Sequence, residues 1–256
     1  MRENTQMDLQ LEGKTALVLG ASKGLGRAIA EALAAEGAGV MTVARSGAGL
    51  PGRLHIHADL DDPAAPQAII ERVRAGGASP DILVLNAGGP PMGGAASTTP
   101  EDFAAVLPRM FNAQLALALA FLPDMRARGF GRILAVASTS LVTPIAGLVL
   151  SNALRALLAS WCKTLANEVA ADGVTVNLLL PGQIATDRLT SLHAEMAAAQ
   201  GLEAEQVTAR SVAAIPAGRL GRPEEFGDIA AFLASPRAGF ITGSAIKVDG
   251  GQTPTL

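Results

Sequence analysis

Short apolar runs alternate with amphipathic segments along most of the chain. Each run has the length of a buried strand, and the segments between them repeat apolar residues at helical spacing. Strands are predicted at residues 14–20, 39–44, 54–57, 81–86, 131–138, 174–180 and 245–248. Helices are predicted at residues 24–36, 61–74, 100–128 with an interruption near Pro108, 148–171 and 223–233. This alternation predicts an α/β fold, a doubly wound parallel sheet of about seven strands with helices on both faces.

The pattern also predicts how the chain is organised. A length of 256 residues fits one large α/β domain better than two small ones. We expect residues 1–10 to form a flexible extension and residues 11–256 to form the domain. Residues 183–216 contain helical fragments but no predicted strand. Because ligands bind at the carboxyl ends of parallel strands, this insertion is expected to cover the substrate.

Composition excludes several classes of protein. Hydrophobic residues make up 49% of the chain and charged residues 17%, which supports a large core and excludes general disorder. The net charge of −3 leaves no basic excess for a nucleic-acid partner. Residues 133–154 are uncharged, but their Ser, Thr, Pro and Gly content favours a strand, a loop and a helix over a membrane span. Cys162 is the one cysteine of the chain, so no internal disulfide can form. The cysteine count therefore predicts no metal site and fits a cytoplasmic location.

A glycine-rich loop follows the first predicted strand and opens the first predicted helix. It reads Gly-Ala-Ser-Lys-Gly-Leu-Gly over residues 20–26. Glycines let the backbone approach a pyrophosphate, and the start of a helix supplies N–H donors and partial positive charge. A tight strand-to-helix turn without a ligand is the alternative interpretation. The candidate contacts to a dinucleotide here are Gly20, Ser22, Lys23, Gly24, Leu25 and Gly26.

Further motifs follow this GxxxGxG loop in a fixed order. They are Asn86-Ala87-Gly88, the strand that ends at Ser138, Pro181-Gly182 with Thr186, and the segments 218–225 and 241–251. With them the chain resembles the short-chain dehydrogenase/reductase family over nearly its whole length, and its β-ketoacyl-carrier-protein-reductase-like members most. The resemblance implies a Rossmann-type fold and hydride transfer between a nicotinamide cofactor and a small carbonyl or alcohol substrate. It also implies a homodimer or homotetramer.

The same resemblance assigns the cofactor-binding residues. It implies that the adenine end contacts Asp59 and Leu60, and that the remaining contacts come from Asn86, Ala87, Gly88, Pro181, Gly182, Ile184 and Thr186. Members that bind NAD usually place an Asp at the end of the second strand, where this chain has Ala44 followed by Arg45. A 2′-phosphate favours cations, so Arg45 and Lys23 favour NADP(H) over NAD(H). A solvated loop charge is the alternative for Arg45.

The chain departs from the family at the reaction centre. Family members carry Tyr-x-x-x-Lys on the long helix, but this chain contains no tyrosine, and family spacing from Ser138 reaches Ser151 and Arg155 instead. The catalytic candidates are therefore Ser138, Ser151 and Arg155. A Ser hydroxyl is far less acidic than a phenol, and Arg is effectively always charged. Arg155 can still bind the nicotinamide ribose, so the cofactor-binding part of the lysine's role survives.

Two other features bear on the missing acid. The family's helix asparagine falls at Met110, with Asn112 two residues away. Pro108 removes a helix N–H, so we expect a freed carbonyl to hold a water that supplies the proton. His193, in the insertion, is either a substitute acid or an exposed helical residue.

These observations leave three functions open. The favoured one is an NADP(H)-dependent oxidoreductase that acts on a small carbonyl/alcohol pair. The second is a nucleotide-binding protein with little or no redox activity and a regulatory or structural role, which the missing tyrosine favours. The third, and weakest, is a non-redox enzyme such as a lyase or dehydratase that uses the bound cofactor.

Overall fold

The computed structural model describes residues 7–47, 49–51, 53–77 and 79–255. Its centre is a seven-stranded parallel sheet in the order β3-β2-β1-β4-β5-β6-β7. The strands are β1 (Thr15–Leu19), β2 (Gly39–Ala44), β3 (His55–His57), β4 (Ile82–Leu85), β5 (Gly131–Val136), β6 (Val174–Pro181) and β7 (Ala245–Val248). The predicted doubly wound parallel sheet in a single Rossmann-type domain is confirmed.

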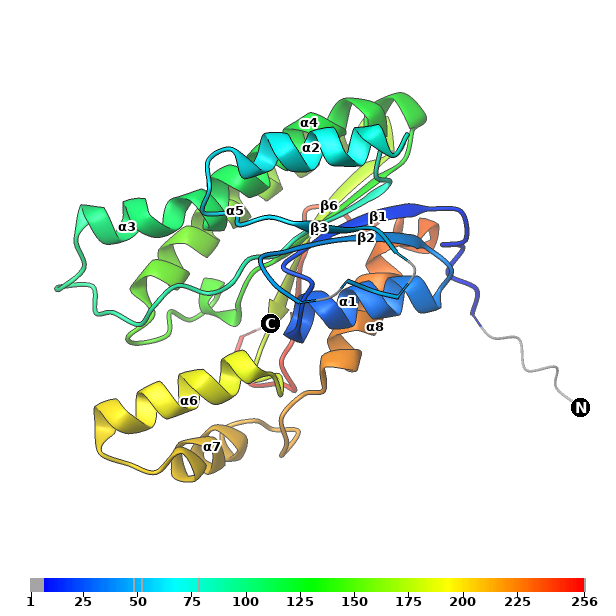
Figure 1. Ribbon diagram of the computed structural model, residues 1–256. Helices are drawn as coiled ribbons and strands as arrows, with labels where there is room; N and C mark the ends of the chain where they lie inside the picture. Colours follow the sequence, from blue (N-terminus) through cyan, green and yellow to red (C-terminus); the bar gives the residue numbers. More distant parts are fainter. Residues whose placement is uncertain (1–6, 48, 52, 78, 256) are drawn as a thin grey trace, which may run out of the picture.

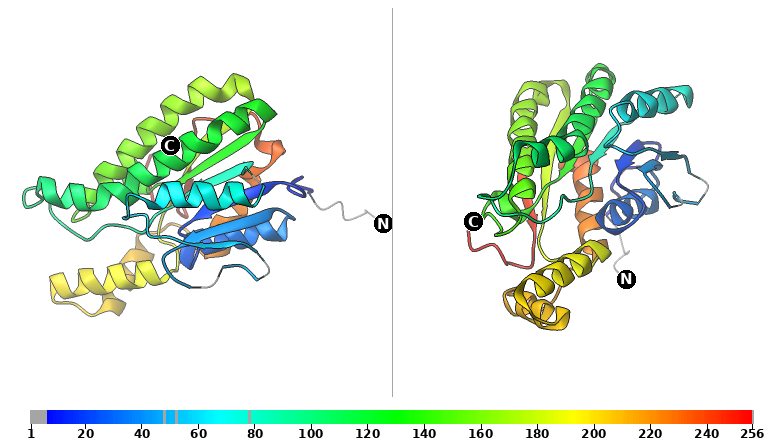
Figure 2. Two further views of the ribbon diagram at one scale, coloured as in Figure 1. Left: turned by 45° about the horizontal axis from the view of Figure 1, so that its top comes forward. Right: turned by 60° about the vertical axis from the view of Figure 1, so that its left-hand side comes forward.

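Helices cover both faces of the sheet, as Figures 1 and 2 show. Successive residues of a strand point to opposite faces, so Leu17 and Leu19 join one core and Ala16 and Val18 the other. The first core packs against α2 (Ala65–Ala75), α4 (Ala113–Arg128) and α5 (Val149–Val169). The second packs against α1 (Gly24–Ala35) and α8 (Pro223–Ala234). Burial on both faces explains why the strands read as continuous apolar runs.

The strand order places the site. From β1 the chain runs outward through β2 and β3, whereas β4 returns to the other side of β1. This reversal between β1 and β4 is the switch point of a doubly wound sheet, where a crevice opens at the carboxyl ends of the strands. The loops that follow β1, β4, β5 and β6 therefore meet at one edge.

The long apolar helical region is divided at Pro108. It consists of α3 (Pro100–Leu107), one π-helical turn (Pro108–Asn112) and α4, which confirms the predicted interruption. Trp161 of α5 packs edge-to-face against Phe111 of this turn, with ring centroids 6.4 Å apart. By length and composition alone, residues 100–128 would suffice to cross a membrane. The packing of α4 against the sheet accounts for that apolar composition equally well.

The helix expected from residue 61 begins later, as α2 at Ala65. The Asp59 carboxylate accepts a hydrogen bond from the Asp61 amide, and the Asp62 carboxylate accepts one from the Ala64 amide. These carboxylates stabilise turns before the helix instead of capping it, which shifts its start.

The segment 183–216 forms two helices at the carboxyl edge of the sheet, α6 (Asp187–Gln200) and α7 (Ala204–Ala213). Figure 1 shows this pair, in yellow and gold, set apart from the helices that flank the sheet. Residues 1–6 of the expected N-terminal extension lie outside the described residues. Next to them, Leu9 packs against the core beneath α1 and α8.

Candidate active site

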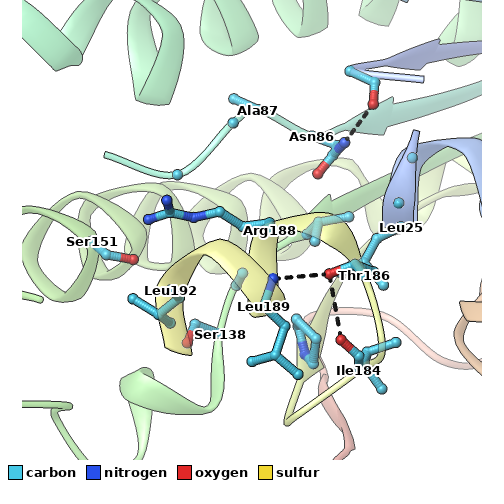
Figure 3. A pocket seen from close by; sticks show the side chains of 18 of the residues that line it. Leu25, Asn86, Ala87, Ser138, Ser151, Ile184, Thr186, Arg188, Leu189 and Leu192 are labelled. Carbon is cyan, nitrogen blue, oxygen red and sulfur yellow. Dashed lines mark hydrogen bonds between the residues drawn. The ribbon is translucent and has the colours of Figure 1, made fainter. Parts of the chain in front are cut away.

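A cavity of about 800 Å³ lies over the carboxyl ends of the central strands, beneath α6. Figure 3 shows it from close by. The residues assigned from the sequence to cofactor binding and catalysis all line it: Gly20, Ser22, Lys23, Gly24, Leu25, Gly26, Arg45, Asp59, Leu60, Asn86, Ala87, Gly88, Ser138, Ser151, Arg155, Pro181, Gly182, Ile184 and Thr186. The fold thus brings motifs from the whole chain to one place.

The glycine loop makes the turn from β1 into α1 very tight. A Cβ on Gly26 would lie 2.3 Å from the Gly20 carbonyl oxygen, and one on Gly20 would lie 2.7 Å from Asn86 Nδ2. Asn86 Nδ2 donates to the carbonyl oxygens of Leu19 at 3.1 Å and Gly20 at 3.2 Å, which ties the end of β4 to the end of β1. Lys23 is the N-cap residue of α1, but its side chain makes no capping hydrogen bond to the first amides of the helix. The first amides of α1 therefore suit a phosphate.

Lys23 and Arg45, the two cations expected at the cofactor, each form an exposed ion pair. Lys23 Nζ lies 3.2 Å from Asp187 Oδ2 of α6, and Arg45 Nη1 lies 4.0 Å from Asp59 Oδ2. Exposed pairs of this kind contribute little to stability, so both cations can turn toward a ligand phosphate. Sequence reasoning missed Arg109, which lines the cavity and donates to both carboxylate oxygens of Asp61 at 2.9 Å.

The reaction end is built by β5 and α5. The Ser138 side chain follows β5 and accepts a hydrogen bond from the Ser140 amide at 3.0 Å. Arg155 and Ser151 stand one turn apart on α5, and Arg155 Nε donates to Ser151 Oγ at 3.2 Å. Arg155 Nη1 donates to the Val136 carbonyl oxygen at 2.6 Å. Burial, aided by the charge of Arg188, lowers the pKa of Arg155 to about 10, so its guanidinium remains charged at neutral pH.

The expected water at the helix interruption stays a prediction, because the carbonyl that Pro108 leaves without its helix partner is that of Ala104, four residues earlier. Gln114 Nε2 donates to the carbonyl oxygens of Arg109 at 3.0 Å and Met110 at 2.9 Å. A side chain thus occupies two carbonyls of the π-helical turn, neither of which is the carbonyl of Ala104. The Met110 side chain is buried with Val106, Leu150 and Leu154, outside the cavity lining.

His193 has neither of the two roles that the sequence suggested for it. Its ring is buried and is not part of the cavity lining, which contradicts an exposed position and removes the support for a substitute acid. Nδ1 lies 2.9 Å from Thr208 Oγ1 of α7, and Nε2 lies 3.1 Å from Gln183 Oε1. Burial lowers the pKa of His193. The residue joins α6 to α7, a contact that periodicity along one helix cannot reveal.

Arg188 of α6 is the main residue that sequence reasoning missed. It lines the cavity, and its Nη2 donates to the Pro90 carbonyl oxygen at 3.0 Å. Its position in the segment 183–216 could have indicated a place near the substrate, but the direction of its side chain depends on how α6 packs. The chain end was also missed: Gln252, Thr253 and Pro254 line the cavity, and the Asp249 carboxylate accepts from the amides of Gly251 and Thr253.

Comparisons with known proteins agree with this geometry. The profile of the family described as "Enoyl-(Acyl carrier protein) reductase" matches residues 20–253. The 3-oxoacyl-[acyl-carrier-protein] reductase FabG of Escherichia coli K12 is 36% identical over 253 residues, covering 95% of this chain and 99% of that protein.

Two solved structures are similar over nearly the whole chain. L-sorbose reductase from Gluconobacter frateurii, complexed with NADPH and L-sorbose, has a TM-score of 0.89 and 33% identity, covering 98% of this chain and 100% of that one. A 3-oxoacyl (acyl-carrier-protein) reductase from Agrobacterium tumefaciens C58, with NADP bound, has a TM-score of 0.85 and 30% identity, with coverages of 97% and 98%.

Proposed function

Because the chain belongs to the short-chain dehydrogenase/reductase family, we propose that it transfers a hydride between NADP(H) and a small carbonyl or alcohol substrate. One observation carries this proposal above the others. A single cavity joins a glycine loop suited to a dinucleotide with an end where Ser138, Ser151 and Arg155 gather. The relatives reported above are named as reductases, and both similar structures hold NADP or NADPH.

The residues present fit a nicotinamide dinucleotide. The glycine loop would hold the diphosphate because a Cβ at Gly20 or Gly26 would collide with neighbouring atoms and close the turn. Arg45 and Lys23, each released from an exposed carboxylate, would hold the 2′-phosphate. Arg155 would bind the nicotinamide ribose, and the loop after β6 would cover the ring. When bound, NADPH supplies the hydride.

The substrate oxygen needs a proton and stabilisation of its developing negative charge, which we assign to Ser138, Ser151 and Arg155. Ser151 Oγ already accepts a hydrogen bond from Arg155, so its own proton is free to be donated. The Ser138 hydroxyl is a second donor to the carbonyl, and the nearby guanidinium favours the negative charge that develops on that oxygen. Because neither hydroxyl is a strong acid, the proton comes ultimately from water. Loss of a positioned acid typically costs about 10²–10⁴ in rate, so slow turnover is expected.

The experiment combines calorimetry with a turnover assay. Titration with NADP⁺ and NAD⁺ should show binding of both or of NADP⁺ alone, with NADP⁺ tighter. NADPH consumption should then be followed with a panel of ketones under single-turnover conditions. Binding of nucleotide with no hydride transfer to any ketone would favour the second function, a nucleotide-binding protein without useful redox activity, which the missing tyrosine already supports. No heat with either nucleotide would overturn both.

We further propose that the protein assembles with copies of itself and acts in the cytoplasm. Leu119 of α4 and Leu157 of α5 are exposed apolar side chains on the outer helices, 51% and 41% accessible. Exposed leucines of this kind suit a contact between subunits. The low cysteine content supports the location.

A further inference from the structure

Two guanidinium groups meet at the reaction end of the cavity. Arg155 comes from α5 and Arg188 from α6, and both line the cavity beside Ser151. Figure 3 shows the Arg188 side chain extended across the cavity in the direction of Ser151. The charge of Arg188 also helps to lower the pKa of Arg155, so the two groups interact electrostatically.

Arg155 has only neutral partners in the part of the chain that the structure describes. Its Nε and Nη1 groups donate to the Ser151 hydroxyl and the Val136 carbonyl. Neither acceptor carries a charge, and no described carboxylate forms an ion pair with this arginine. A half-buried charge without a counter-ion attracts an anion, and Nη2 still has both of its N–H groups to offer.

Arg188 is only weakly neutralised. Its Nη1 lies 3.5 Å from Glu195 Oε1, and both side chains are 45% exposed, so solvent screens the pair. Its Nη2 donates to the neutral Pro90 carbonyl. Most of this positive charge is therefore available to a ligand.

The other charges of the cavity are already matched. Among the described residues, its acidic lining side chains are Asp59 and Asp187, which pair with Arg45 and Lys23 at the cofactor end. Arg109 pairs with Asp61. A nicotinamide nucleotide would bring its phosphates to the glycine loop, whereas its ribose hydroxyls at Arg155 are neutral. The excess positive charge therefore remains where the substrate binds.

We propose that the substrate is a small ketone that also carries a carboxylate, and that Arg188 binds this carboxylate in the field of Arg155. Arginine matches a carboxylate through paired N–H donors. This inference rests on the proposed function: the hydride adds to the ketone carbon, a proton reaches its oxygen through Ser151, and the carboxylate passes unchanged into a hydroxy acid. Leu148, Leu189 and Leu192 line the cavity and suit a short carbon chain.

The test compares each keto acid with its own neutral ester. Acetoacetate and levulinate, their methyl esters and the neutral ketose L-sorbose would be assayed with NADPH. We expect kcat/KM for each acid to exceed that of its ester by about tenfold or more, the size of a hydrogen-bonded charge contact. Arg188→Gln should remove this preference by raising KM for the acids, so that acid and ester give the same kcat/KM within that variant, while Arg188→Lys should retain part of the preference. Arg210→Gln, on the exposed side of α7, is the matched control.

Calorimetry separates failure of this inference from failure of the proposed function. Levulinate and methyl levulinate would be titrated into the NADP⁺-loaded protein. Equal turnover of acids and esters would overturn the carboxylate inference but would still support the proposed oxidoreductase function. If no ketone is reduced, the proposed function fails. The inference would still be supported if levulinate binds more tightly than methyl levulinate and Arg188→Gln abolishes this difference. Equal binding of the two compounds, or no binding of either, would overturn the inference. If Arg188→Gln does not fold, the wild-type comparison and Arg188→Lys decide.

Discussion

At the scale of single residues, the proposed reaction site lacks the acid that the family resemblance implies and keeps the positive charge. Where the family resemblance places Tyr and Lys, this chain has Ser151 and Arg155, joined by a 3.2 Å hydrogen bond. The serine is too short and too weak an acid to replace a phenol, whereas the guanidinium can stabilise an alkoxide without giving up its own proton. The proposed mechanism therefore relies on electrostatic stabilisation where the family resemblance implies a positioned acid.

A double substitution tests whether only the acid is missing. Ser151→Tyr combined with Arg155→Lys should raise carbonyl reduction by about 10²-fold, the lower end of what a general acid contributes. Single-turnover NADPH oxidation is the measurement, and Ser151→Ala, which removes the hydroxyl, should lower the rate. An unchanged rate in the double variant would mean that the pocket itself has changed, not just its proton donor.

The proposed preference for NADP(H) also rests on single residues. Arg45→Ala should weaken binding of NADP⁺ about tenfold, because a charged hydrogen bond to the 2′-phosphate is lost, and leave NAD⁺ unchanged. Calorimetry with the two nucleotides measures this. Arg53→Ala, an exposed arginine outside the cavity lining, is the matched control. Equal weakening for both nucleotides would contradict a role at the 2′-phosphate.

At the scale of elements, the helix pair α6 and α7 depends on a buried imidazole. Burial keeps the pKa of His193 below its usual value of 6.5, so the unfolded chain takes up a proton at a higher pH than the folded protein does. The stabilisation from the neutral ring is therefore complete above pH 6.5 and is lost as the pH falls through the folded-state pKa.

We accordingly expect the melting temperature to fall between neutral and mildly acidic pH, and His193→Gln to reduce this slope. His55 also has a lowered pKa, through burial and then the neighbouring His57, and adds to the same pH window. The measurement is therefore the difference in slope between wild type and variant. The same slope in wild type and His193→Gln would show that the ring at position 193 does not titrate on unfolding.

Elements were predictable where burial on both sides makes a strand fully apolar. The range 39–44 agrees with β2, and Pro108 marked the interruption between α3 and α4. The range 245–248 agrees with β7, although that edge strand is not buried. The start of α2 was not predictable, because its aspartates stabilise turns as readily as they cap a helix. The contacts of His193 and Arg188 were missed for a common reason: their partners lie on other elements, and only tertiary packing brings them together.

At the scale of the whole molecule, assembly is the remaining prediction. We expect the wild type to run as a multiple of its 26.0 kDa chain mass in light scattering after gel filtration. Leu119→Arg or Leu157→Glu should shift it toward the single-chain mass, because a charge replaces an exposed apolar contact. Arg72→Glu on the exposed surface of α2 is the control. A wild type at the single-chain mass would contradict the homo-oligomer.

The edge-to-face packing of Trp161 on Phe111 has a practical consequence for anyone who studies this protein in solution. With no tyrosine and one tryptophan, the near-ultraviolet emission comes from a single indole, free of a phenol background. That indole lies beside the π-helical turn and outside the lining of the cavity. Its fluorescence is therefore an optical reporter of the α5 side of the fold, and a change on adding coenzyme would signal a rearrangement transmitted through that helix.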